Sequence, residues 1–262
     1  MKVISANHQD QVFVAEVSRR MLSICLYESG GWPTHDPDGF RTLNRGGRAG
    51  VAVVDFAGRC CCVKLFYDSR FFILWRNRFG FSKAARAFRK GLELKARGVD
   101  CPAMIGYAVD RKSGMTILIT EFASDAERID HRIKRGGVDA AIAAALGCFI
   151  RRMHDAGVIH KDLSPRNLLV REASGNYEFL LLDYEDACFF RAVPESMQLD
   201  NLHHLHERTF TTVPEEIRRE FLAAYLGEKG RVEAWCGRLK KMIMDRPSKY
   251  TQRNNAEGIS NV

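Results

Sequence analysis

The sequence has no apolar segment long enough to cross a membrane. Its longest uninterrupted apolar stretch runs over residues 140–150 and contains one glycine, well short of the ~20 residues that a bilayer core requires. The opening residues, MKVISANHQDQ, contain no apolar core and do not resemble a secretory signal. We therefore expect a protein that is made and kept in the cytoplasm.

Proline is scarce, with 7 residues, and the 21 glycines follow no repeat, so collagen-like and low-complexity chains are excluded. Hydrophobic residues make up 46% of the chain and aromatic residues 10%, which is enough to bury a core and excludes a wholly disordered chain. No internal repeat is visible. The 262 residues suit one large domain or two small lobes.

The sequence lacks any C-x-x-C pair, although it contains 8 cysteines, three of them adjacent at positions 60–62. A structural zinc site is therefore disfavoured. Because a cytoplasmic compartment is reducing, we expect free thiols that behave as small buried hydrophobic side chains.

The order of the predicted elements suggests two parts with different composition. Up to residue 123 the chain is rich in predicted strands: a Gly-containing turn and β-branched run over 42–54, a second strand over 60–67 after Gly58, and strands near 105–109 and 116–122. One helix, over 82–97, begins at Ser82 and ends at Gly98. From residue 124 onwards helices dominate, beginning with a strong helix over 140–156. We predict an α+β fold with an N-lobe over 1–123 and a C-lobe over 124–262.

The most informative segment is HKDLSPRN, residues 160–167, which has the form H-x-D-x-x-x-x-N. It follows a predicted helix and precedes an apolar run. Phosphoryl transfer needs a carboxylate that accepts the proton of the attacking hydroxyl and a nearby oxygen ligand for Mg²⁺. Asp162 and Asn167 could supply both from one short loop, and His160 would anchor the backbone rather than act as a base.

Three further features have the positions that nucleotide chemistry requires. Asp183 ends an apolar strand sixteen residues after Asn167, a spacing that suits a β-hairpin returning to the same place. Lys64 lies on a predicted buried strand, where an anionic partner such as a phosphate would offset its cost. Gly46 and Gly47 lie in the turn before the first hairpin, where glycines let backbone N–H groups approach phosphate.

These features, in this order, resemble the protein-kinase-like superfamily. Within it the chain is most similar to the bacterial lipopolysaccharide core kinases, which phosphorylate Kdo or heptose sugars. The resemblance runs from about residue 41 to 226 and depends on the helix and exit RAFR…GVDCP, the loop GVIHKDL and the segment LLLDYE. RIO-type kinases and aminoglycoside phosphotransferases have similar short loops.

The resemblance implies a two-lobed fold with ATP and Mg²⁺ in the cleft between the lobes. It also implies residue roles: Asp162 as the catalytic base, Asn167 and Asp183 as metal ligands, and Lys64 as the lysine that pairs with phosphate. Glu121 would mark the hinge that holds adenine, and Asp200 would be a helix residue that anchors the catalytic loop.

The sequence also departs from the superfamily pattern. Tyr184-Glu185 follows the metal-binding Asp in place of Phe-Gly, and no Ala-Pro-Glu motif follows, which argues against a long activation loop. Ala87 occupies the position expected for the helix carboxylate that pairs with Lys64. Glu93 is six residues further on and falls on another helix face, because six residues turn a helix by about 240°.

Charge suggests where the acceptor is found. The formal net charge is +8, and residues 70–97 contain one acidic residue, Glu93, among nine basic ones with interleaved aromatic residues. Such a face suits an anionic membrane surface or a phosphorylated glycolipid, although a solvated helix face beside core aromatics is an equal alternative. Nucleic acid is the least favoured partner. The histidines at 203, 204 and 206 are expected to be solvated or capping rather than metal ligands.

We therefore expect an ATP-dependent kinase that transfers the γ-phosphoryl group to a hydroxyl of a lipopolysaccharide core sugar. It would work at the cytoplasmic face of the inner membrane. The alternatives are a kinase that acts on a protein or a small cytosolic molecule, and a pseudokinase that binds nucleotide and regulates a partner.

Overall fold

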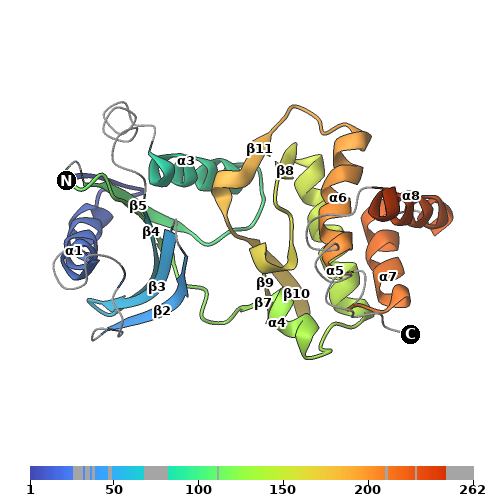
Figure 1. Cartoon of the computed structure of the whole chain (residues 1–262), viewed down its shortest axis with the longest axis horizontal. Coiled ribbons are helices and arrows are strands. Elements are labelled where there is room, and N and C mark those ends of the chain that lie inside the picture. The colour runs from blue at the N-terminus through green and yellow to red at the C-terminus, as the bar shows by residue number, and fades with distance from the viewer. Residues whose placement is uncertain are drawn as a thin grey trace. The chain divides into compact units, whose positions relative to one another are not determined.

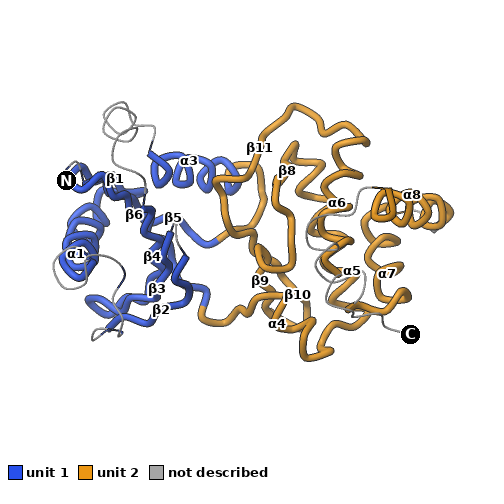
Figure 2. Tube along the Cα trace, in the orientation of Figure 1, with its two compact units in different colours: residues 1–95, 102–123 blue, residues 96–101, 124–262 orange. Residues whose placement is uncertain are grey.

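The computed structural model describes residues 1–25, 32, 36, 39–46, 49–67, 82–110, 112–209, 212–227 and 229–245. The chain separates into two compact units. Unit 1 comprises residues Met1–Lys95 and Pro102–Ala123, and unit 2 comprises Ala96–Cys101 and Ser124–Val262 (Figure 2). Among the described residues, no helix is both long and apolar enough to span a membrane.

Unit 1 is built on a six-stranded antiparallel sheet with the strand order β1-β5-β6-β4-β3-β2 (Figure 1). The strands are β1 (Lys2–Ser5), β2 (Phe40–Arg45), β3 (Ala49–Phe56), β4 (Arg59–Phe66), β5 (Met104–Val109) and β6 (Thr116–Glu121). The predicted hairpin of β3 and β4 is confirmed. Ala57 and Gly58 form its two-residue turn, and both have a positive φ, as such turns require.

In the described part of unit 1, two helices cover the sheet. Helix α1 (Asp10–Ser23) buries Val14, Val17 and Met21 in one core with strand residues that include Ala108. Helix α3 (Lys83–Ala96) contacts β5 through Phe88, whose ring centroid lies 5.3 Å from that of Tyr107. Adjacent strand residues point to opposite faces, so α1 and α3 lie against opposite faces of the sheet.

The predicted start and end of α3 are confirmed. The Ser82 hydroxyl accepts a hydrogen bond from the backbone N–H of Ala85, and Gly98 adopts the positive φ that ends many helices. The N-terminal segment was not predicted: the sequence indicates no element before residue 42, whereas the structure contains β1, α1 and the start of β2 there.

Unit 2 is mainly helical. It contains α4 (Ile129–Lys134), α5 (Ala140–Asp155), α6 (Glu195–Thr209), α7 (Glu215–Leu226) and α8 (Val232–Asp245). Helices α5 and α7 approach closely because Gly147 has no side chain: a Cβ there would lie 2.3 Å from the Phe221 carbonyl oxygen. Phe149 of α5 packs on Phe179, with ring centroids 5.9 Å apart, so α5 supports the strands of this unit.

Two small sheets carry the loops of unit 2. One has the order β10-β9-β7, formed by β7 (Glu127–Arg128), β9 (Leu168–Ala173) and β10 (Asn176–Leu181). The other pairs β8 (Val158–His160) with β11 (Ala187–Phe189). Short 3-10 helices lie between β8 and β9 (η2, Pro165–Asn167), between β10 and β11 (η3, Tyr184–Asp186) and between α7 and α8 (η4, Lys229–Arg231). The antiparallel pair β9–β10 confirms the predicted hairpin between Asn167 and Asp183.

The eight cysteines are all free thiols, as predicted. Their burial differs from the expectation, because only Cys25, Cys61 and Cys236 are buried, and Cys60 and Cys148 are exposed. Alternation along β4 explains the difference within the run at 60–62. Burial raises the pKa of Cys61 to about 12, so this thiol stays protonated and inert.

Candidate functional site

The loop between β8 and β9 holds Asp162 and Asn167 together. The Asn167 side-chain Nδ2 donates to the Asp162 main-chain oxygen at 2.8 Å and to its carboxylate Oδ2 at 3.2 Å. Asn167 is buried, whereas the Asp162 side chain is 52% exposed. The loop therefore fixes a carboxylate that solutes can reach. Because Nδ2 faces Asp162, the Asn167 amide oxygen is left as the atom that could bind a cation.

Asp183 is tied to the same loop from the end of β10. The backbone N–H of Leu182, the residue before it, donates to the Asn167 carbonyl at 2.9 Å. The His160 ring nitrogen Nε2 lies 3.0 Å from the Asp183 carbonyl. Asp183 adopts a left-handed conformation, with φ 55° and ψ 53°, which Asp tolerates better than most residues. The three predicted unit 2 residues thus belong to one hydrogen-bonded assembly.

His160 anchors the backbone, as predicted. Its side chain is fully buried, and Nε2 donates to the Asp183 carbonyl, since a carbonyl oxygen can only accept. The other ring nitrogen, Nδ1, is buried and has no hydrogen-bond partner in the described part of the chain. A ring that is so enclosed cannot exchange protons with a substrate.

The residue that anchors the loop from helix α6 is Asn201, and the prediction of Asp200 was wrong. Asp200 is exposed, whereas the buried Asn201 donates from Nδ2 to the His160 carbonyl at 2.6 Å. The two residues are adjacent, so one step along the helix moves a side chain by about 100°. The pattern of apolar residues on α6, with Leu199, Leu202 and Leu205 buried, could have placed position 201 beside them.

Asn201 belongs to a buried chain of hydrogen bonds through His154. Nε2 of His154 lies 3.0 Å from the Asn201 side-chain oxygen, and Nδ1 lies 2.7 Å from the Tyr225 hydroxyl. The same hydroxyl lies 2.7 Å from the Gln198 side-chain oxygen. Burial lowers the pKa of His154 to about 4. At neutral pH the ring is uncharged, with its proton on Nε2 facing Asn201. Helices α5, α6 and α7 are thereby joined to the loop that holds Asp162.

Arg208 was not singled out from the sequence, yet it contacts Asp162. Its Nη2 donates to the carboxylate oxygen Oδ1 at 3.1 Å, and its own side chain is 31% exposed. Arg208 lies 46 residues from Asp162 in the sequence. Only the return of α6 to the loop brings the two residues together, and no local pattern signals that return.

In unit 1, Lys64 and Glu121 lie on the adjacent strands β4 and β6. Lys64 is half-buried between the buried Val63 and Leu65, and its Nζ lies 5.2 Å from the centre of the Phe66 ring. Glu121 is exposed at the end of β6, and its backbone N–H donates to the Ala103 carbonyl at 2.9 Å. On α3, Ala87 is buried and Glu93 is exposed, which agrees with their predicted placement on different helix faces.

Gly46 is the described member of the predicted glycine pair. Its backbone N–H donates to the Ala49 carbonyl at 3.0 Å, and a Cβ at this position would lie 2.9 Å from the same oxygen. The turn before β3 therefore needs a residue without a side chain. Gly47 and residues 70–81 of the predicted basic and aromatic segment lie outside the described residues.

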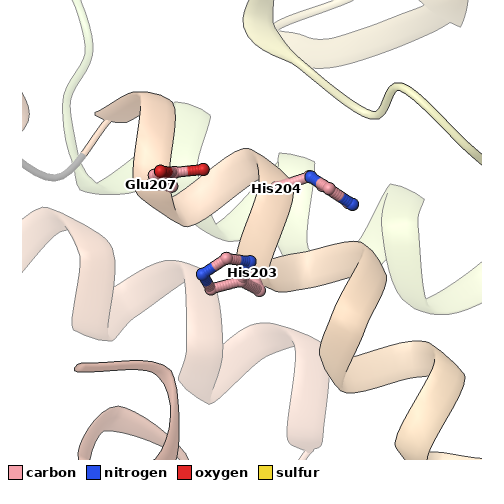
Figure 3. A group of neighbouring side chains, drawn as sticks. All are labelled: His203, His204 and Glu207. Atoms are coloured by element: carbon pink, nitrogen blue, oxygen red, sulfur yellow. The ribbon is translucent and has the colours of Figure 1, made fainter. Parts of the chain in front are cut away.

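The histidines on α6 differ from the expectation. His203 and His206 are each 8% exposed rather than solvated, and only His204 is exposed. His203, His204 and Glu207 bring potential ligand atoms within 4.8 Å of one another, although their side chains leave the helix in different directions (Figure 3). Burial lowers the pKa of His206 to about 4, and the nearby Arg218, His203 and Lys240 add to this effect.

Residues 43–225 match the model of the Lipopolysaccharide kinase (Kdo/WaaP) family. The chain belongs to this family. It is 34% identical over 155 residues to the 3-deoxy-D-manno-octulosonic acid kinase of Mannheimia succiniciproducens, which covers 56% of this chain and 63% of that protein. It is 36% identical over 83 residues to the calcium/calmodulin-dependent protein kinase type I of Schizosaccharomyces pombe, which covers 28% of this chain and 25% of that protein.

A solved structure of WaaP in complex with acyl carrier protein has a similar fold. The TM-score is 0.59 at 14% sequence identity, and the match covers 98% of this chain and 99% of that one. The predicted α+β, two-lobed kinase-like fold and the predicted family are confirmed. This chain spans less than two thirds of the length of the two curated relatives described above.

Proposed function

We propose that this protein is a phosphotransferase that moves the γ-phosphoryl group of ATP to a hydroxyl of a lipopolysaccharide core sugar. The observation that carries the proposal is the family match, because residues 43–225 include every residue predicted for the site, from Gly46 to Asp183. The relative from M. succiniciproducens is named as a kinase of 3-deoxy-D-manno-octulosonic acid. This name supports an acidic sugar as the acceptor.

Asp162 would act as the general base. Its carboxylate is half exposed and is held by Asn167, so an acceptor hydroxyl can reach it. The hydroxyl oxygen would form a bond to the γ-phosphorus while the bond to the departing ADP oxygen breaks. The hydroxyl proton would pass to Asp162. Such reactions depend on positioning and charge stabilisation rather than on a covalent intermediate.

Asn167 and Asp183 fit the binding of a divalent cation. Asn167 offers its amide oxygen, because its nitrogen faces Asp162, and Asp183 offers a carboxylate. Oxygen ligands of this kind suit Mg²⁺. When bound, Mg²⁺ would offset the negative charge of the phosphates. The link between Leu182 and the Asn167 carbonyl keeps the two ligand positions together.

Residues of unit 1 would bind the nucleotide. Lys64 would pair with phosphate oxygens, which would offset the cost of keeping an ammonium group on a half-buried strand. The absence of side chains at Gly46 and Gly47 would let this turn approach the phosphates closely. Glu121 lies at the end of β6, at the hinge where main-chain groups would bind adenine.

The enzyme would bind its acceptor at the cytoplasmic face of the inner membrane. Helix α3 has exposed cationic side chains at Arg86, Arg89 and Lys95. Each basic side chain near an anionic lipid surface adds roughly 1 kcal/mol of attraction. A glycolipid acceptor anchored in such a surface would therefore be brought to the enzyme by charge.

A protein acceptor is the second candidate. It is supported by the local similarity to the protein kinase of S. pombe, which covers 28% of this chain. The absence of an Ala-Pro-Glu motif after Asp183 disfavours it, since that motif accompanies the activation segment of protein kinases.

The test is transfer of ³²P from [γ-³²P]ATP to extracted envelope glycolipid and, in parallel, to total soluble protein. We expect label in the glycolipid fraction, loss of that label in the Asp162→Asn variant, and loss when a chelator removes divalent cations. Asp155→Asn is the matched control, because Asp155 pairs with Arg151 on the surface of α5. Label in soluble protein alone would contradict the proposed acceptor.

A further inference from the structure

Arg208 and Asp162 form an ion pair that solutes can reach. Arg208 Nη2 donates to Asp162 Oδ1 at 3.1 Å, and the two side chains are 31% and 52% exposed. The other carboxylate oxygen, Oδ2, accepts from Asn167. The proposed base therefore has an amide on one side and a cation on the other. Exposed ion pairs of this kind contribute little to stability, so a role in folding does not explain the pair.

Helix α6, which also holds the loop around Asp162, sets the position of the Arg208 guanidinium group. Asn201 and Arg208 are seven residues apart on α6, two helical turns, so both side chains leave the same side of the helix. Asn201 holds the His160 carbonyl, and Arg208 contacts Asp162 two residues further on. One rigid element thus fixes the distance between the guanidinium group and the base, which is the property expected of a binding group.

The chemistry of the pair points to an anionic ligand. A guanidinium group has N–H donors along more than one edge and binds carboxylates through two parallel hydrogen bonds. It can therefore contact Asp162 along one edge and an anionic group of the acceptor along another.

We propose that Arg208 determines acceptor specificity by binding the carboxylate of an acidic sugar and holding the sugar's hydroxyl toward Asp162. This inference rests on the proposed function, because it assumes transfer to such a sugar. A lysine would not reproduce the role fully, since it offers a point charge in place of the planar fork.

The experiment compares two acceptors that differ only in charge: a glycoside of 3-deoxy-D-manno-octulosonic acid and the same glycoside with its carboxylate converted to the neutral amide. For the wild type we expect a KM for the amide at least about tenfold above that for the acid, as loss of a charge-assisted bidentate contact implies. Arg208→Gln should raise the KM for the acid by a similar factor, with little change in kcat, and should no longer distinguish the two acceptors. The KM of Arg208→Lys for the acid should lie between the values of the wild type and of Arg208→Gln.

Arg171→Gln is the matched control. Arg171 has a similar exposure, 34%, and pairs with Glu178 and Asp125 away from the catalytic loop, so its removal should leave both KM values unchanged. An equal loss of kcat for both acceptors in Arg208→Gln would overturn the proposal, since it would assign Arg208 to the base or to the transferred group. Unchanged KM values would overturn it as well. The wild type tests the acceptor itself: no transfer to either compound would contradict the proposed function and remove the role of Arg208 with it.

Discussion

The Asn201 side-chain amide donates to the His160 main-chain oxygen at 2.6 Å, although the two residues are 41 positions apart. His160 in turn donates to the Asp183 carbonyl. A single buried amide on α6 therefore supports, through His160, the backbone next to the proposed base Asp162 and the backbone of the proposed metal ligand Asp183. Its own orientation is fixed by His154.

Asn201→Ala should lower both stability and turnover. The substitution leaves the buried His160 carbonyl and His154 Nε2 without their partner, which costs about 1–3 kcal/mol for each group that water does not satisfy. We expect a lower free energy of unfolding in urea, and a lower kcat with a nearly unchanged KM for ATP, because the loop moves while the unit 1 residues do not.

The control for this variant is Asp200→Ala. Asp200 is adjacent but exposed, so its removal should change neither property measurably. A large loss of activity in Asp200→Ala with none in Asn201→Ala would mean that the anchor has been assigned to the wrong residue.

Asp162→Asn should lose turnover while keeping nucleotide affinity. An amide cannot accept the hydroxyl proton, and general bases typically contribute roughly 10²- to 10⁴-fold to the rate. The substitution keeps the side-chain shape and leaves the proposed metal ligands Asn167 and Asp183 unaltered. Turnover and equilibrium binding of an ATP analogue measure the two effects separately. A variant with wild-type turnover would remove the general base from the mechanism.

Local chemistry allowed much of the fold to be predicted. The first hairpin follows from the turn residue Gly58, which has a φ of 74°, and the second follows from the spacing between Asn167 and Asp183. The limits of α3 follow from Ser82 and Gly98. The proximity of Asp162 and Asn167 also follows from the sequence, because they are only five positions apart in one loop. Signals of this kind act over a few residues and can be read from a single chain.

Contacts over long sequence separations were missed or misplaced. Arg208 reaches Asp162 only because α6 returns to the loop, and choosing between Asp200 and Asn201 requires the rotation of that helix about its axis. Helix α1 was missed because its apolar positions, including Val14, Val17 and Met21, become a recognisable face only when the sheet they cover is known. Packing decides these features, and a single sequence does not specify packing.

Gly157→Ala should be far more destabilising than Gly175→Ala. Both glycines have a positive φ, 75° and 77°, a conformation that costs other residues roughly 1–2 kcal/mol. A Cβ at position 157 would also lie 2.2 Å from the Phe190 carbonyl oxygen, whereas one at position 175 would meet nothing within 4 Å. We expect a loss of about 2–5 kcal/mol for the first and about 1 kcal/mol for the second, as measured by urea unfolding. Since residue 157 directly precedes β8 and His160, only the first should also reduce turnover.

Acid should destabilise the protein through the buried His206. Burial, with Arg218, His203 and Lys240 nearby, lowers the pKa of His206 from 6.5 to about 4, against a smaller opposing effect of Glu215. Between these two values the unfolded chain binds a proton that the folded chain does not, so the free energy of unfolding falls as pH falls from about 6.5 to about 4. A shift of this size corresponds to a loss on the order of 3 kcal/mol over that window.

Replacement of His206 by Gln should remove this pH dependence in part. Gln keeps a hydrogen-bond acceptor for Arg218, which lies 3.3 Å from His206 Nε2, but it does not titrate. Urea unfolding between pH 4 and pH 7 should therefore show a shallower fall in stability for His206→Gln than for the wild type, with the remaining slope due in part to His154, whose pKa is also lowered to about 4. Leu205→Ala, at a buried neighbouring position, controls for loss of packing, because it should lower stability equally at every pH. If His206→Gln and the wild type lost stability in parallel, the charge on His206 would have no part in acid unfolding.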